Sequence, residues 1–262
     1  MTLREFAKGY DGNIMLKAFE NEKSTTPTAI MMTQITDSIK DEVLDKEVYS
    51  YTMVCTSLFE RYLRVNFDTE FTGLHQNTTL ISIGLVSDEG ERFYAELTDY
   101  DETQCDDWIT KNVLDHLLLS GNTELEKELE EDELTTRVIG NRDDVRTELL
   151  NWLDGFGDDI QFVSDVCHYD MVLLCELIAD GAMLLPEYIN PFCHDLCQDI
   201  SMILDISEKA AFDISREQLL TDRGIDLPKG QKHNALYDAE VIKAIYEDFF
   251  SVGGVKQGGK NG

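Results

Sequence analysis

The stretch VNFDTEF at residues 65–71 decides how this chain is organised, and TLISIGLV follows it at residues 79–86 after a short turn. Both runs are rich in β-branched and aromatic residues, which is typical of two neighbouring buried strands of one sheet. The side chains of a strand alternate between its faces, so Asp68 and Glu70 are predicted to share one face. Two carboxylates on a buried face repel each other unless a divalent cation binds between them. The sequence therefore predicts a metal site on this strand.

Composition bounds the class of protein. The chain has 262 residues, of which 42% are hydrophobic, enough for one large domain with an extension. The formal net charge of −30 argues against a broad grip on duplex nucleic acid, which requires a basic surface. It leaves room for an enzyme that holds a few nucleotides through metals and local basic residues, and it favours solubility.

The cysteines and the apolar runs indicate the compartment. The six cysteines are spread along the chain without C-x-x-C spacing, which is typical of buried thiols in a reducing compartment. Zinc at Cys193, His194 and Cys197 is the alternative, but a second ligand pair of suitable spacing is missing. No apolar run reaches the roughly 18 residues of a membrane span, and the N-terminus has no signal-peptide core. We expect a cytoplasmic protein without membrane contact.

The order of elements predicts an α/β fold, a mixed β-sheet flanked by helices with an N-terminal extension. A DEG turn leads to a third strand at residues 92–97, which completes an antiparallel meander. A further strand is predicted at 160–164. Helices are predicted at residues 106–119 with Trp108, Val113 and Leu117 inward, at 142–154 with Asn141 as N-cap, and at 169–178, 192–204 and 234–250. The acidic residues 120–136 are either a solvated helix or a loose insertion.

Three segments are expected along the chain. Residues 1–62 form an extension to which the sequence assigns no role. Residues 63–252 form the catalytic domain, and the glycine-rich tail at 253–262 is expected to be disordered.

Two further acids and a histidine extend the metal site. Asp170 opens a helix directly after a strand, and Asp238 lies one turn inside the last helix, five residues after His233. Four carboxylates from separate elements suit a two-metal phosphodiester hydrolase, whose ions lie about 3.5–4 Å apart. A histidine with a pKa of about 6.5 can take a proton from the attacking water. Asp165 is the rival of Asp170 for the third position, and either could instead cap the helix.

Three motifs together carry a family resemblance: DTEF at 68–71, HYD at 168–170 and HNALYDA at 233–239. They resemble the DEDDh 3′–5′ exonucleases of the ribonuclease-H-like fold. Within that superfamily the chain is most similar to the bacterial and phage RNase AS-like exoribonucleases, over roughly residues 65–250. The likeness continues through TTLISIGLV at 78–86, the DEG turn and YDMVLLCEL at 169–177.

The resemblance implies an enzyme that removes nucleotides from the 3′ end of RNA or short oligonucleotides and releases nucleoside 5′-monophosphates. Asp68, Glu70, Asp170 and Asp238 would hold two Mg²⁺ or Mn²⁺ ions, and His233 would be the general base. Such enzymes are commonly homodimers. The expected location is the cytoplasm of a bacterium, or of the host if the chain is phage-encoded.

Residues near these motifs are candidates for substrate contacts. Phe71, Tyr169 and Leu74 could stack on a terminal base, although core packing is the alternative for the two aromatic rings. The cations Lys232, Lys229 and Arg223 could contact phosphates. Two other functions remain open: the same chemistry on DNA, or a non-catalytic acidic protein that mimics nucleic acid towards a basic partner.

Overall fold

The computed structural model describes residues 13–18, 29–34, 62–119 and 132–250. The chain divides into two compact units, one of residues 1–60 with 252–262 and the other of residues 61–251. In the first unit, strands β1 (Asn13–Ala18) and β2 (Ala29–Gln34) pair antiparallel. The rest of the predicted extension and the tail at 253–262 lie outside the described residues. No described helix combines the length and apolar character needed to cross a bilayer.

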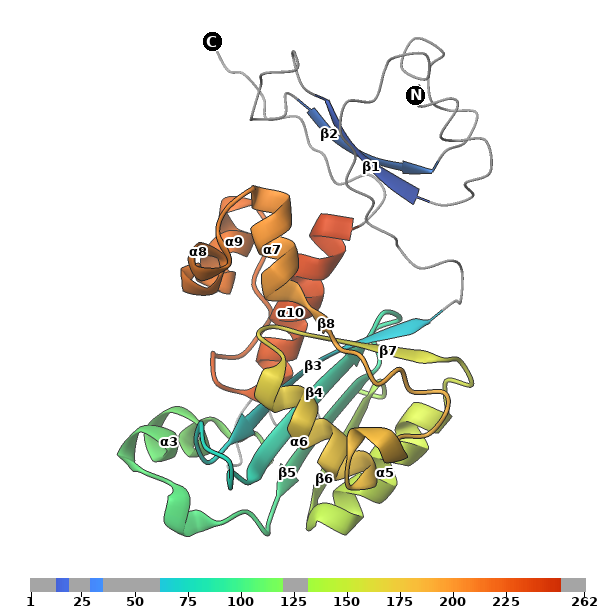
Figure 1. The fold of residues 1–262 in the computed structure, drawn as a ribbon. Coiled ribbons are helices and arrows are strands. Elements are labelled where there is room, and N and C mark those ends of the chain that lie inside the picture. The colour runs from blue at the N-terminus through green and yellow to red at the C-terminus, as the bar shows by residue number, and fades with distance from the viewer. Residues whose placement is uncertain (1–12, 19–28, 35–61, 120–131, 251–262) are drawn as a thin grey trace. The chain divides into compact units, whose positions relative to one another are not determined.

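The second unit is built on a six-stranded mixed sheet with the order β6-β5-β4-β3-β7-β8 (Figure 1). Its strands are β3 Leu63–Phe71, β4 Leu80–Ser87, β5 Arg92–Leu97, β6 Thr135–Gly140, β7 Ile160–Ser164 and β8 His194–Asp195. The predicted meander is confirmed, because β3, β4 and β5 pair antiparallel in sequence. The pairs β3–β7, β7–β8 and β5–β6 are parallel, so β4 alone among these strands runs opposite to the others. The predicted α/β class and ribonuclease-H-like arrangement are confirmed.

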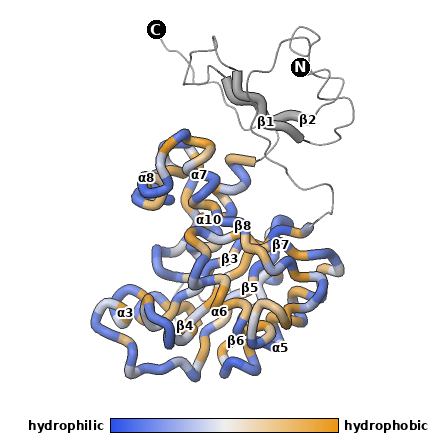
Figure 2. Tube along the Cα trace, in the orientation of Figure 1, coloured by the Kyte–Doolittle hydropathy of each residue, from blue (hydrophilic) through white to orange (hydrophobic). Residues whose placement is uncertain are grey.

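Helices cover both faces of this sheet (Figure 1). The helical elements are η1 Glu102–Gln104, α3 Asp107–Asn112, η2 Leu114–His116, α5 Arg142–Asp154, α6 His168–Ala179, η3 Ala182–Leu184, α7 Leu196–Leu204, α8 Glu208–Asp213, α9 Arg216–Asp222 and α10 Ala235–Phe250. The main core joins β3, β4, β5 and β7 to α5 and α6, whose apolar stripe is orange in Figure 2. The helix α10 packs on the opposite face, against Val86 and Tyr94.

Gly84 allows α10 to lie directly on the sheet. A Cβ at this position would lie 2.3 Å from the backbone nitrogen of Leu236 and 2.4 Å from the carbonyl carbon of Ala235. Gly84 is also the β4 partner of Asp68 in the antiparallel register. The missing side chain therefore brings the start of α10 close to the strand that carries the first two acids.

Three predicted elements differ from the structure. The helix predicted at 106–119 breaks after Asn112 into a 3₁₀ turn, and Trp108, predicted to be buried, is 52% exposed. Thr135 and Thr136, placed in the acidic stretch, begin strand β6, which pairs in parallel with β5. The helix predicted at 192–204 begins only at Leu196, because the two residues before it pair with β7 as β8.

Candidate active site

Strand β3 presents the first two acids on the face that α10 covers. Val65 and Phe67 point into the core with α6, so the alternation of the strand turns Asp68 and Glu70 to the opposite face. Both acids are only partly buried, unlike most of β3. The register shifts between Glu70 and Phe71, so the strand ends in an irregularity just beyond the acids.

Asp170 reaches the same end of the sheet from the other side. Because β7 runs parallel to β3, the chain that leaves β7 enters α6 beside the end of β3 that carries the acids. Asp170 lies in the first turn of α6 and is buried. Its Oδ1 accepts hydrogen bonds from the backbone nitrogen of Thr69 at 3.1 Å and from the Thr69 hydroxyl at 2.5 Å. Thr69 therefore fixes the orientation of the Asp170 carboxylate at the end of β3 that carries the two acids.

Replacing Thr69 by valine tests this support. Thr69→Val keeps the shape and the strand propensity but removes the hydroxyl that donates to Asp170. We expect Mn²⁺ affinity to fall about 10- to 100-fold, the usual cost of losing a group that orients a metal ligand. Isothermal titration calorimetry measures this affinity. Thr136→Val on β6, far from the acids along the sheet, is the matched control and should leave it unchanged.

The start of α10 supplies the remaining two groups. Asp238 Oδ2 accepts a hydrogen bond of 2.8 Å from the backbone nitrogen of His233, which closes the loop before the helix. His233 has a left-handed backbone with φ +64°, and its Nδ1 lies 4.0 Å from Glu70 Oε1. Ligand atoms of Glu70, His233 and Asp238 all lie within 4.8 Å of one another. Among the described residues, these three form a group that could hold a metal ion.

A buried polar network fixes the loop that carries His233. The Asn234 amide nitrogen donates to the Tyr94 hydroxyl at 3.2 Å and to the carbonyl of His116 at 3.0 Å. His116 Nδ1 lies 3.0 Å from the carbonyl oxygen of Lys232. Tyr94 in turn donates to Glu96, which also accepts from the backbone nitrogens of Leu118 and Leu119. His233 thus lies between Lys232, whose carbonyl contacts His116 of η2, and Asn234, whose side chain is bonded to β5 and η2.

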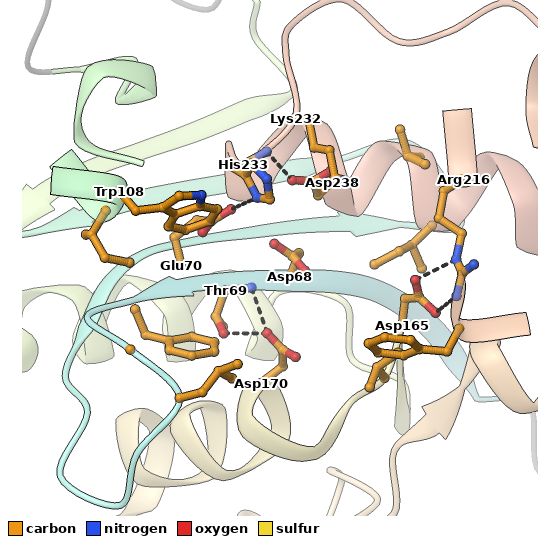
Figure 3. A pocket seen from close by; sticks show the side chains of 18 of the residues that line it. Asp68, Thr69, Glu70, Trp108, Asp165, Asp170, Arg216, Lys232, His233 and Asp238 are labelled. Carbon is orange, nitrogen blue, oxygen red and sulfur yellow. Dashed lines mark hydrogen bonds and ion pairs between the residues drawn. The ribbon is translucent and has the colours of Figure 1, made fainter. Parts of the chain in front are cut away.

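All five groups open into one cleft of about 560 Å³ (Figure 3). Figure 3 shows Asp68 between Glu70 and Asp170, with His233 and Asp238 above them. Seven carboxylates line the cleft, but Arg216 and Lys232 are its only lysine or arginine side chains among the described residues. This excess of negative charge suits the binding of cations.

The comparisons with known proteins identify the family. The family model of the 3′–5′ exoribonuclease Rv2179c-like domain matches residues 63–249. The chain belongs to this family. It is also 30% identical over 139 residues to the 3′–5′ exoribonuclease Rv2179c of Mycobacterium tuberculosis strain H37Rv, which covers 52% of this chain and 73% of the relative. The predicted family is confirmed, and the chain is a 3′–5′ exoribonuclease.

Solved structures of nucleases are similar at lower identity. The nuclease domain of 3′hExo, a DEDDh family member bound to rAMP, has 15% identity and a TM-score of 0.47 over 71% of this chain and 90% of that one. Pop2p of S. pombe, in an Mg²⁺- and Mn²⁺-bound form, has 18% identity and a TM-score of 0.43 over 71% and 82% of the two chains. The family assignment rests on the family model and the mycobacterial relative.

The carboxylates of this exoribonuclease perturb one another. Burial, together with the charges of neighbouring acids, raises the pKa of Asp68 and of Glu70 well above their ordinary values. Burial raises the pKa of Asp170 to about 6, although hydrogen bonds from Thr69 oppose the shift. Burial also raises the pKa of Asp238 to about 7. Without a cation, the carboxyls of this site therefore keep their protons to higher pH than exposed carboxyls do.

The pKa of His233 shifts in the opposite direction, downwards. Burial, and to a smaller extent the charges of Lys232 and His116, lower the pKa of His233 from its ordinary 6.5. The neutral imidazole is therefore the form present at neutral pH, and only that form can accept a proton.

Asp165, the rival of Asp170, is engaged elsewhere. It lies just after β7 and lines the cleft, but its two oxygens accept from Arg216 Nε at 2.6 Å and Nη2 at 2.8 Å. Within the described part of the chain, no lysine or arginine pairs with Asp170, and its hydrogen bonds come from Thr69. The geometry favours Asp170 as the third acid.

The predicted substrate contacts divide into two groups. Phe71 and Lys232 line the cleft, as does the exposed Leu74. Tyr169 is not among the described residues that line it, but its ring stacks on Phe71 with the centroids 5.6 Å apart. The other two predicted phosphate contacts, Lys229 and Arg223, also lie outside the lining. Lys229 borders a separate pocket beside α10, and Arg223 pairs with Asp248 and lies over the Phe249 ring.

Sequence reasoning missed two aromatic side chains at the cleft. Trp108 lies edge-on to the His233 ring with the centroids 5.1 Å apart. Phe212, 60% exposed, lines the cleft from the C-terminal part of α8. The spacing of Trp108 with Val113 was compatible with a buried helix face, so the break after Asn112 was the missing information. Nothing local to Phe212 signalled a position near the site.

Proposed function

We propose that this exoribonuclease uses two divalent cations, held by Asp68, Glu70, Asp170 and Asp238, to hydrolyse the 3′-terminal phosphodiester of RNA. His233 is the general base, and nucleoside 5′-monophosphates are the products. The observation that carries the proposal is the convergence of these five side chains, from β3, α6 and the start of α10, on one cleft. The mycobacterial relative, named a 3′–5′ exoribonuclease, supports the same reaction.

The donor set fits Mg²⁺ or Mn²⁺. Carboxylate oxygens are the ligands that both ions prefer. Among the described residues, no arginine or lysine forms an ion pair with any of the four carboxylates, so their negative charges need a cation to balance them. Burial raises the pKa values of Asp170 and Asp238, which reflects the cost of keeping these two carboxylates charged without a cation. Bound cations would polarise the scissile phosphate and stabilise the charge that develops on the leaving oxygen.

The protein's own residues arrange the reaction. Glu70 and His233 lie on one side of Asp68, and Asp170 lies on the other (Figure 3). In the proposed reaction, the attacking water gives a proton to His233 at Nδ1, the ring nitrogen beside Glu70. The water oxygen bonds to phosphorus, and the 3′-oxygen of the preceding nucleotide leaves and is protonated by solvent. Phe71 and Leu74 offer apolar surface to the terminal base, and Lys232 a cation to phosphate.

The identity of the products tests this function. An RNA labelled with ³²P only at its last phosphodiester should release all label as nucleoside 5′-monophosphate at the earliest times, in the presence of Mn²⁺ or Mg²⁺. Label that stays on the shortened chain would indicate a 3′-phosphate product, and label released in short oligonucleotides would indicate internal cleavage. Either result contradicts the proposal. A DNA oligomer of the same sequence, made with and without a single 3′-terminal ribonucleotide, tests whether the enzyme requires RNA or also hydrolyses DNA.

The histidine's role predicts a selective loss. His233→Asn should lower kcat about 10²- to 10⁴-fold, the usual contribution of a general base, because the amide cannot accept the water proton. Asparagine tolerates the left-handed backbone at this position, so the loop should keep its shape. Single-turnover kinetics measure the loss, and His75→Asn in the exposed loop after β3 is the control. A variant as active as wild type would exclude His233 as the base.

Cation binding should depend on pH in a defined direction. Asp170 and Asp238 are protonated below their raised pKa values of about 6 and about 7, so cations must displace protons there. The metal-free fold binds these protons more tightly than the unfolded chain, so its stability falls as pH rises from about 4 to about 7. We expect the increase in Tm caused by Mn²⁺ to be small at pH 5 and large at pH 8. Differential scanning fluorimetry measures it, and a pH-independent increase would contradict the site.

A further inference from the structure

We propose that Arg216 is a positioning residue, which withholds the Asp165 carboxylate from the cations and anchors the α8–α9 wall of the cleft to the end of β7. The inference rests on the proposed function, because it concerns a fifth carboxylate beside the four proposed ligands. It assigns a role to the one arginine that lines the cleft among the described residues.

The guanidinium of Arg216 is almost fully used within the protein. Two of its nitrogens donate to the two oxygens of Asp165 at 2.6 and 2.8 Å, a bidentate arrangement. The third nitrogen, Nη1, donates to the carbonyls of Ala211 and Ile214, both at 2.7 Å. The side chain is only 12% exposed. An arginine held in this way is fixed in place and is poorly suited to reach for a substrate phosphate.

These contacts join two parts of the chain that are distant in sequence. Asp165 directly follows β7, whereas the two carbonyls belong to α8 and the turn before α9. Phe212 at the end of α8, and Ile214 and Ser215 in that turn, all line the cleft. The pair of Arg216 with Asp165, drawn in Figure 3, therefore holds the α8–α9 wall of the cleft against the end of β7.

Asp165 lines the same cleft as the four proposed ligands. An unpaired carboxylate in this cleft would attract cations and compete with Asp170 for them. In the bidentate pair its charge is balanced, and both of its oxygens are occupied by donors.

The balanced charge of the Asp165–Arg216 pair predicts how Mn²⁺ affinity changes in single and double variants, and the anchoring of the α8–α9 wall predicts how kcat changes. Arg216→Met should bind Mn²⁺ about tenfold more tightly, because it frees a negative charge, yet should have a lower kcat. Asp165→Asn should bind Mn²⁺ about tenfold more weakly, because it leaves an uncompensated cation at the cleft. The double variant D165N/R216M should return Mn²⁺ affinity to within about threefold of wild type, since the pair as a whole is neutral.

The experiment measures Mn²⁺ affinity by calorimetry and kcat on labelled RNA for wild type and these variants. Arg216→Lys keeps the positive charge but loses the bidentate geometry and the contacts with the two carbonyls. It should keep near-wild-type Mn²⁺ affinity with a lowered kcat. It also replaces Arg216→Met in the test if that variant does not fold. Shifts of the same sign in both single variants, or no shift in either, would overturn the inference. Failure of the wild-type protein to bind Mn²⁺ or release nucleotides would instead overturn the proposed function.

Discussion

Asp68→Asn should lower kcat/KM on RNA by about 10³-fold or more and, at the same time, raise the Tm of the metal-free protein. The loss of activity follows if Asp68, which lies between the other acids, is shared by the cations, since an amide neither carries the charge nor bridges two ions. The gain in stability follows from repulsion, because Asp68 is the acid whose pKa is raised by Asp170, Asp238 and Glu70 together, in addition to burial.

The size of the stability gain can be bounded. Removal of one like charge from a crowded cluster is worth about 1 kcal/mol, which shifts Tm by about 2–4 °C in a domain of this size. The measurement is a thermal melt in EDTA at pH 8, which lies above the raised pKa values of Asp170 and Asp238. Asp158→Asn, an exposed acid before β7, is the control and should change neither quantity. Loss of both activity and stability would show that Asp68 is structural, which would contradict our account.

Gly84→Ala should damage the fold and the site together. The added methyl would lie 2.3–2.4 Å from backbone atoms of Leu236 and Ala235, which cannot give way as a flexible side chain can. Overpacking typically costs about 1–3 kcal/mol, and a clash with helix backbone belongs at the upper end of that range. The helix α10 must then move away from β4 and carry Asp238 with it, so we expect activity to fall at least about tenfold even at temperatures where the variant remains folded.

The control for Gly84→Ala is another glycine. Gly155 ends α5 with φ −61°, and the nearest atom to an added Cβ is 3.3 Å away. Gly155→Ala should therefore leave the free energy of unfolding within about 1 kcal/mol of wild type and activity unchanged. Urea unfolding compares the two variants. If Gly84→Ala were as stable and active as Gly155→Ala, the close contact between α10 and β4 would not position the site.

Most of the sheet could be predicted because local patterns and tertiary demands agree there. The strand β3 has mostly apolar residues on one face and acids on the other, and β4 is mostly apolar, so both were recognisable from composition alone. The same holds for α5, whose N-cap Asn141 forms the predicted capping interaction with the first turn. The four acids and His233 could be proposed because strand ends and helix starts limit where these side chains can meet.

The remaining elements depend on contacts that a single segment does not encode. Strand β6 exists because β5 offers it a parallel edge, and the acidic residues before it hid its β-branched pattern. Arg216 could not be paired with Asp165 from sequence, since 50 residues and several turns lie between them. Trp108 was assigned to the buried side of its helix, but α3 buries the neighbouring Ile109 instead and leaves Trp108 exposed. The sequence assigns no role to residues 1–62, and the predicted homodimer stays a prediction.

The most direct test of the central claim is anomalous scattering from a crystal soaked with Mn²⁺ and a nucleoside 5′-monophosphate. We predict two anomalous peaks about 3.5–4 Å apart, coordinated by Asp68, Glu70, Asp170 and Asp238, with the phosphate beside them and His233 facing it. Asp165 should remain paired with Arg216 and should not coordinate either ion. Peaks elsewhere on the protein, with none within coordination distance of Asp68, would contradict the account.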